Sequence, residues 1–167
     1  MPDVKLIDNR NFAPENLGEV CVLGLGKTGE VVSRYLCELL GKRVENVHVY
    51  AGEKKEFAMR VADKLLKKGA TVSFDDKVIE HKFDLCIASP GIPIVSDLMQ
   101  SAIENCGEVI SEIEFAWRES STNSKWVAIT GTNGKTTTTS LTTHILQQVG
   151  KHALSVGNIG NVALDAV

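Results

Sequence analysis

The chain has 167 residues, a formal net charge of −3 and no concentration of basic residues. This length suffices for one domain with a sizeable core, or for one domain and part of another. The scattered charges argue against a nucleic-acid-binding stripe, and no apolar run approaches the length of a membrane span. The first ten residues lack the apolar core of a signal peptide. We therefore expect a cytoplasmic monomer that binds neither nucleic acid nor membrane.

The four cysteines lie far apart in the sequence, with no Cys-x-x-Cys pair, at Cys21, Cys37, Cys86 and Cys106. Two of them fall inside apolar runs that predict core strands, where cysteine behaves as a small hydrophobe. We expect four reduced thiols, without a disulfide framework or a cysteine metal site. The four histidines have no partners at ligand or triad spacing, so we expect them to be structural or exposed.

Apolar runs alternate with amphipathic stretches through the first two thirds of the chain. Strands are predicted at residues 19–23, 47–50, 71–74, 83–88 and 108–110, and helices at residues 28–40, 54–68 and 96–105. Ser111 and Glu114 fit a capping box that begins a further helix. This alternation predicts an α/β fold, a Rossmann-like parallel sheet with helices on both faces.

A polar, unpatterned stretch at residues 119–124 predicts a linker. We therefore divide the chain into a Rossmann-like domain at residues 1–124 and the start of a P-loop ATPase-type α/β domain at residues 125–167. In the second part we expect a strand at 126–129, a helix at 136–149 and a strand at 153–156. About forty residues cannot complete a domain, so we expect the chain to be the N-terminal part of a longer protein.

The first glycine loop, Gly24-Leu25-Gly26-Lys27-Thr28-Gly29, follows a predicted strand and precedes a predicted helix. This is the context of the G-x-G-x-x-G loop of dinucleotide-binding folds, so the motif predicts a phosphate site. A nicotinamide site places an acid at the end of the second strand, where this chain has Ala51; Glu53 lies two residues further. The absence of an acid at position 51 counts against an NAD site, although a nicotinamide-dependent oxidoreductase stays an alternative.

The second glycine loop is the most informative motif, Gly131-Thr132-Asn133-Gly134-Lys135-Thr136, followed by three more threonines. Glycines let backbone N–H groups face phosphate oxygens, and a helix N-terminus adds partial positive charge. Lys135 can reach terminal phosphates, and the Thr136 hydroxyl can ligate Mg²⁺. The general P-loop has four residues between its first glycine and Gly-Lys, whereas this loop has two.

Residues 130–137 resemble the ATP loop of the Mur ligases and of the related folylpolyglutamate synthetases, which use this shortened spacing. Residues 24–29 and the Ser-Pro-Gly-Ile segment at 89–92 narrow the resemblance to the D-glutamate-adding branch, and it covers residues 19–164. The resemblance implies a ligase that uses ATP and Mg²⁺ to phosphorylate the carboxylate of UDP-N-acetylmuramoyl-L-alanine. The acyl phosphate then reacts with the amine of D-glutamate, in peptidoglycan precursor synthesis.

The resemblance also assigns residues to roles. It implies ATP binding by Gly131, Thr132, Asn133, Gly134, Lys135, Thr136 and Thr137. Of these, Lys135 and Thr136 are the catalytic candidates, and Thr136 is the Mg²⁺ candidate. It implies UDP-substrate binding by Gly26, Lys27, Thr28, Ser89, Gly91 and Asn158. The family's remaining ligands come later in its sequences, so we expect residues 1–167 to bind without turnover. A nucleotide-binding module without catalysis is the other alternative.

Overall fold

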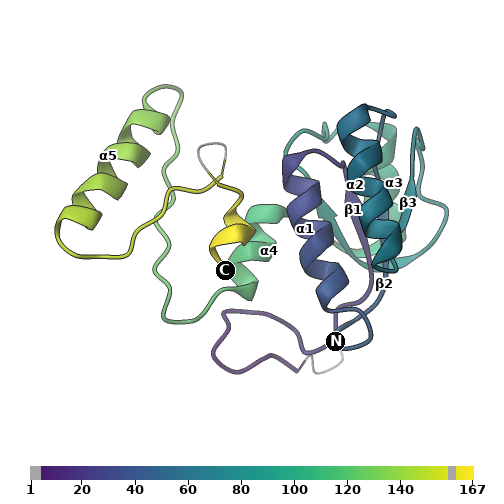
Figure 1. Cartoon of the computed structure of the whole chain (residues 1–167), viewed down its shortest axis with the longest axis horizontal. Helices are drawn as coiled ribbons and strands as arrows, with labels where there is room; N and C mark the ends of the chain where they lie inside the picture. The colour runs from purple at the N-terminus through teal and green to yellow at the C-terminus, as the bar shows by residue number, and fades with distance from the viewer. Residues whose placement is uncertain (1–4, 158–160) are drawn as a thin grey trace.

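The computed structural model describes residues 5–157 and 161–167. Five strands form one parallel sheet in the order β3-β2-β1-β4-β5. Their bounds are β1 (Gly18–Leu23), β2 (Val44–Tyr50), β3 (Thr71–Ser73), β4 (Phe83–Ala88) and β5 (Cys106–Ser111). Figure 1 shows this sheet, with β1, β2 and β3 labelled. Each strand predicted before residue 111 is present, and the α/β class with a parallel sheet is confirmed.

Helices cover both faces of this sheet. Their bounds are α1 (Lys27–Glu38), α2 (Glu56–Lys67), α3 (Asp97–Asn105), α4 (Glu112–Glu119) and α5 (Lys135–Gln148), with a 3₁₀ helix η1 (Ala163–Ala166). Buried residues of α1, α2 and α4 pack on one face, and those of α3 pack on the other. Within residues 5–157 and 161–167, no helix is both long and apolar enough to cross a membrane.

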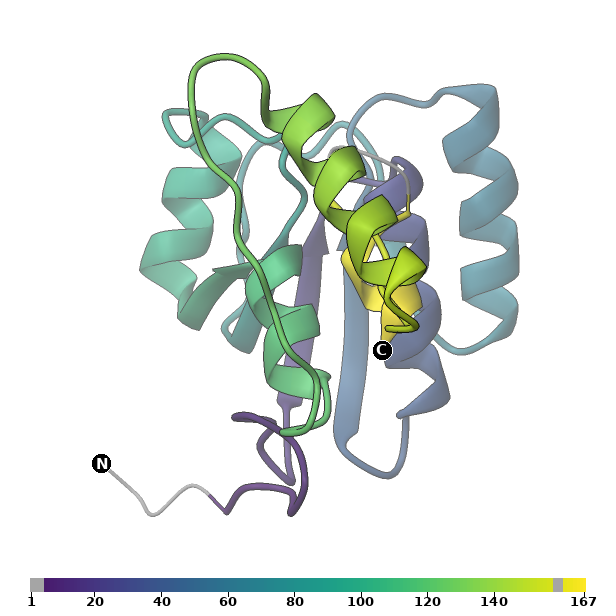
Figure 2. The same ribbon diagram turned by 90° about the vertical axis from the view of Figure 1, so that its left-hand side faces the viewer.

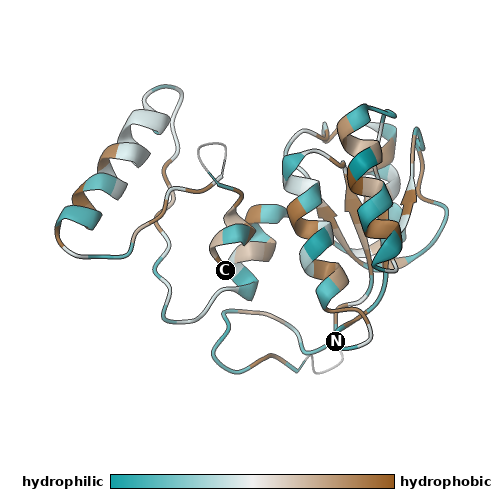
Figure 3. Cartoon of the chain, viewed as in Figure 1, coloured by the Kyte–Doolittle hydropathy of each residue, from teal (hydrophilic) through white to brown (hydrophobic). Residues whose placement is uncertain are grey.

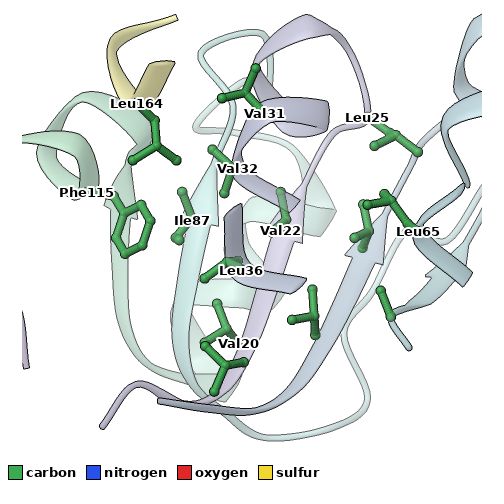
Figure 4. Packing of buried hydrophobic residues seen from close by; sticks show 14 of the residues in the cluster. Val20, Val22, Leu25, Val31, Val32, Leu36, Leu65, Ile87, Phe115 and Leu164 are labelled. Carbon is green, nitrogen blue, oxygen red and sulfur yellow. The ribbon is translucent and has the colours of Figure 1, made fainter. Parts of the chain in front are cut away.

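The core follows from the two-residue period of the strands. Along β1, Val20 and Val22 face α1, whereas Cys21 and Leu23 face α3. Figure 4 shows Val22 close to Val32 and Leu36 of α1 on the first face. Figure 3 shows the strands mainly in hydrophobic colours, between helices that carry hydrophilic residues outward. Continuous apolar runs in the strands therefore reflect burial on both faces.

Of the two hydrogen bonds of the predicted capping box at the start of α4, the one accepted by the Ser111 hydroxyl is present. The Ser111 hydroxyl accepts a hydrogen bond from the Glu114 backbone N–H at 3.2 Å. Glu114 instead accepts from the Arg118 side chain at 2.9 Å. The serine cap satisfies one of the backbone donors that a helix leaves without a partner at its start.

Two predicted strands are absent, and both predictions were wrong. Residues 126–129 and 153–156 form no strand; Val156 makes only an isolated bridge with Asn161. Helix α5 is present as predicted, but none of its residues is buried, and Leu141 and Val149 are 57% and 65% exposed. Helix α5 stands apart from the sheet in Figure 1, and in Figure 2, which is turned by 90°, it lies in front of the sheet. A strand needs a neighbour for its N–H and C=O groups, and the described residues supply none here.

The end of the chain returns to the first face of the sheet. Val162, Ala163 and Leu164 are buried in the same core as Phe115 of α4. The buried Glu112 carboxylate accepts a hydrogen bond from the Leu164 N–H at 2.8 Å. Burial raises the pKa of Glu112, and its hydrogen bonds to the backbone oppose that rise. Residues 162–164 therefore pack against α4. The predicted boundary between two domains at residues 124 and 125 stays a prediction.

Glu119, which is fully buried at the end of α4, joins three segments that are distant in sequence. One carboxylate oxygen accepts from Arg10 at 2.9 Å, from Tyr35 at 2.7 Å and from Arg43 at 2.7 Å. Arg43 also donates to the other oxygen at 2.8 Å, so this pair is bidentate. Burial and the Glu119 carboxylate raise the pKa of Tyr35. This network fixes the segment before β1 and the start of β2 against α4.

We expect Glu119→Ala to lower the free energy of unfolding by about 3–5 kcal/mol. The reason is that Arg43, with a side chain only 13% exposed, keeps a charge without its partner. Urea unfolding followed by circular dichroism measures the change. The matched control is Glu56→Ala, which removes a solvent-exposed pair with Arg60 and should change stability little. Equal effects of the two variants would contradict a structural role for the network.

Candidate functional site

The carboxyl ends of β1, β2 and β4 meet at one edge of the sheet. The Gly24 N–H after β1 donates to the Tyr50 carbonyl of β2 at 2.8 Å, and the Ser89 N–H after β4 donates to the Leu23 carbonyl at 3.0 Å. The chain leaves β1 toward β2 and β3 and then crosses back to β4 on the other side of β1. Open α/β sheets bind ligands at such a reversal of strand order.

Three glycines of the first loop meet three different constraints. Gly24 has φ +89°, a conformation that favours glycine. Gly29, buried in the first turn of α1, has no room for a side chain, because its Cβ would lie 1.9 Å from the Gly24 carbonyl oxygen. A Cβ at Gly26, which precedes α1, would meet no atom within 4 Å. The start of α1 is therefore packed tightly on the sheet side and open at Gly26, which suits a phosphate group.

Ser89 lies directly beside this loop. Its hydroxyl donates to the Gly24 carbonyl oxygen at 3.4 Å, and its side chain borders the space next to Gly24. Gly91 follows in the same turn, and a Cβ there would meet no atom within 4 Å. The structure thus brings Gly26, Ser89 and Gly91 to one edge of the sheet, with Lys27 and Thr28 in the first turn of α1. Their contacts with a ligand stay predictions.

The end of β2 supplies no acid at the position where a nicotinamide site has one. Ala51 is buried, and its N–H donates to the Ser73 carbonyl at 2.8 Å. Glu53 is 77% exposed at its side chain and pairs with Lys55 at 3.1 Å. Position 51 therefore cannot accept hydrogen bonds from ribose hydroxyls through its side chain.

The second glycine loop lies directly before α5. Gly134 is left-handed at φ +75° and stands immediately before the helix, and Gly131 has φ +150°. Lys135, the first helical residue, folds back and donates to the carbonyl oxygens of Gly131 and Thr132. Residues 131–138 are all exposed. The N-terminal N–H groups of α5 and the Lys135 ammonium are thus accessible to an anion.

The residues of this loop fit a magnesium nucleotide. Thr136 offers a hydroxyl oxygen, the hard donor that Mg²⁺ prefers, and the first turn of α5 contains no acid that would repel phosphate. Mg²⁺ commonly keeps several waters and takes phosphate oxygens with only one or two protein ligands. Thr136 could therefore hold the ion together with the nucleotide, and Lys135 could neutralise phosphate charge once it leaves its carbonyl partners.

The two loops belong to separate parts of the structure, because α5 stands apart from the sheet (Figure 1). The predicted substrate residue Asn158 lies outside the described residues. On its flanks, the Gly157 N–H donates to the Asn161 carbonyl at 3.0 Å. A cavity of about 580 Å³ lies at the other end of the sheet, lined partly by Phe12, Trp117 and Arg118. None of the predicted site residues lines this cavity.

Comparison with known proteins relates this chain to the Mur ligases. The Mur ligase middle domain model matches residues 129–165. A UDP-N-acetylmuramoylalanine–D-glutamate ligase of Thermobifida fusca (strain YX) is 36% identical over 148 residues, 88% of this chain and 31% of that protein. The enzyme of the same name from Trichodesmium erythraeum (strain IMS101) is 38% identical over 86% of this chain and 30% of its own length. The enzyme of the same name from Lactobacillus acidophilus (strain ATCC 700396 / NCK56 / N2 / NCFM) is 37% identical over 96% of this chain and 33% of its own length.

The chain therefore belongs to the Mur ligase family. It spans about a third of the length of these curated relatives. The match to the middle domain model begins at residue 129 and includes the whole second glycine loop. The longer matches to the relatives also include most of the sheet.

Sequence reasoning missed two sets of residues that the structure brings together. The capping box of Ser111 and Glu114 predicted only the start of a helix, and it gave no role to Glu112, whose side chain is buried against residues 163–164. Cys21, Cys86 and Cys106 have sulfur atoms within 4.8 Å of one another. Hydrogen bonds from the other two thiols lower the pKa of Cys106. The strand order, which pairs β1 with β4, is the signal that would have linked Cys21 to Cys86.

We expect Gly29→Ala and Gly26→Ala to separate packing from ligand access in the first loop. Gly29→Ala should lower the free energy of unfolding by about 1–3 kcal/mol or more, because its Cβ meets a backbone oxygen that cannot move independently. Gly26→Ala should cost about 1 kcal/mol or less, since its φ of −86° suits alanine and the space is open. Thermal unfolding of both variants measures this, and equal losses would contradict the geometry.

Proposed function

We propose that the natural protein carrying this chain is a cytoplasmic ATP-dependent ligase that joins D-glutamate to UDP-N-acetylmuramoyl-L-alanine. The observation that carries the proposal is the presence of two glycine loops, each before a helix, with Gly26 facing open space in one and Lys135 at the helix start in the other. The names of the curated relatives support the choice of substrates. A nicotinamide enzyme would leave the Lys135 loop without a role.

The two loops would divide the substrates between them. Gly26, Lys27 and Thr28 would hold the diphosphate of the UDP-sugar at the start of α1, where N–H groups and the helix dipole favour anions. Ser89 and Gly91 border the same edge and would contact the nucleotide. The loop at residues 131–137 would hold ATP. Asn158 is the candidate for contact with the muramoyl end of the substrate.

The chemistry would proceed through an acyl phosphate, because a free carboxylate is a poor electrophile. Transfer of the γ-phosphoryl group of ATP to the substrate carboxylate creates a good leaving group. The amine of D-glutamate then attacks the acyl carbon, and phosphate departs as the amide forms. Phosphoryl transfer depends mainly on positioning and charge neutralisation. Lys135 and the N-terminal N–H groups of α5 would supply both, and Thr136 would help to hold the Mg²⁺ that neutralises phosphate charge.

We expect the 167-residue chain to bind UDP-N-acetylmuramoyl-L-alanine saturably and to show no binding of NADH. Isothermal titration calorimetry measures both. Gly26→Ala should weaken the UDP-sugar affinity about tenfold, a loss of about 1.4 kcal/mol, by placing a methyl group where the phosphate approaches. The control Glu56→Ala, on exposed α2, should leave the affinity unchanged. Binding of NADH in place of the UDP-sugar would contradict the proposed role of the first loop.

We expect Lys135→Ala in the natural protein to reduce D-glutamate-dependent phosphate release by about 100-fold or more, because charge on the transferred phosphoryl group loses its cation. Lys135→Arg should retain part of the activity, and Lys151→Ala, beyond the other end of α5, should retain all of it. A phosphate-release assay with all three substrates measures these rates. Full activity of Lys135→Ala, or ligation by residues 1–167 alone, would contradict the assignment.

A further inference from the structure

Three cysteines from three parts of the sequence meet on the face of the sheet that α3 covers. Cys21 of β1 and Cys86 of β4 are direct partners in the parallel register. Cys106 begins β5 immediately after α3. The three sulfur atoms lie within 4.8 Å of one another, and those of Cys21 and Cys106 are 3.7 Å apart. Adjacent strands therefore present three soft donor atoms to one point.

The cluster is closed on one side and open on the other. Cys21 and Cys86 are fully buried, beside Met99 and Ala102 of α3. Cys106 is half-buried and lines a cavity of about 400 Å³. Three acidic residues, Glu19, Asp84 and Glu104, also line this cavity, together with one basic residue, Lys82. A cation would therefore be attracted to the opening and would reach Cys106 first.

The spacing of the sulfur atoms suits metal coordination. A tetrahedral ion with metal–sulfur bonds of about 2.3 Å holds its sulfur ligands roughly 3.8 Å apart. A disulfide brings its sulfur atoms to about 2.05 Å, so the 3.7 Å separation of Cys21 and Cys106 is that of co-ligands or packed thiols. Sulfur ligands select thiophilic ions over Mg²⁺. Packing alone would not require the solvent opening or its acidic lining.

We propose that Cys21, Cys86 and Cys106 form a binding site for a thiophilic divalent ion of the Zn²⁺ and Cd²⁺ class. The fourth position is left to a solvent molecule from the cavity at Cys106. Each thiol that becomes a ligand releases its proton to solvent, and no oxidation is involved. The ion joins β1, β4 and β5, so it stabilises the sheet.

The test is a titration of the reduced 167-residue chain with Cd²⁺, followed by the sulfur-to-cadmium charge-transfer absorption. We expect saturation at one ion per chain. Cys106→Ser should weaken binding at least tenfold, because the accessible ligand is lost. The matched control is Cys37→Ser, which removes the half-buried thiol of α1 and should leave binding unchanged. Saturation that Cys106→Ser does not weaken, or that Cys37→Ser abolishes, would overturn the site.

Thermal unfolding with and without Zn²⁺ is the second measurement, with folding of each variant checked by circular dichroism. An ion that binds only the folded chain raises the unfolding midpoint, by an amount that grows with the logarithm of the ratio of free ion concentration to Kd. We expect this rise for the unsubstituted chain and for Cys37→Ser, and its loss in Cys86→Ala, which keeps an apolar group in the core. Absence of the rise in the unsubstituted chain, or its persistence in folded Cys86→Ala, would refute the proposal.

Discussion

The close approach of α1 to the end of β1 determines the geometry of the ligand-facing edge. Gly29 lies so near the Gly24 carbonyl oxygen that even a methyl group would overlap it. This contact directs the first turn of α1 at the open space by Gly26, and the parallel sheet brings Ser89 to the same place. The loop glycines are therefore not interchangeable, since one allows packing and another allows access.

Most of the first fold could be predicted from the sequence, because its signals are local. Apolar runs marked β1 and β4, a 3.6-residue period marked α1 and α2, and Ser111 marked the start of α4. Strand order was not local information. The meeting of Cys21, Cys86 and Cys106, and the convergence of Arg10, Tyr35 and Arg43 on Glu119, depend on that order and on long-range packing.

The failures after residue 124 have one physical cause. Residues 126–129 and 153–156 have strand-like composition, but backbone groups in a strand need neighbours, and no sheet strand of the described chain lies beside them. Helix α5 forms because its hydrogen bonds are internal, although its apolar residues stay exposed. Among the candidate site residues, the positions of Gly26 and Gly134 just before two helices could be predicted from the sequence, whereas ligand contacts depend on surfaces that assemble at longer range.

The segment that follows α5 connects the two parts of the chain through a buried carboxylate. The Glu112 carboxylate accepts a hydrogen bond from the Leu164 N–H, and Val162 and Ala163 are buried in the core between the sheet and α1. A Cβ at Gly157 would lie 3.8 Å from the side chain of Ile113, so this end of the segment also lies against α4. Because Glu112 is buried, replacing it would leave the backbone N–H groups of η1 without a hydrogen-bond acceptor, in addition to removing a side chain from the core. The position of residues after the second glycine loop therefore depends on packing against α4, and a substrate that spans both loops would have to fit that constraint.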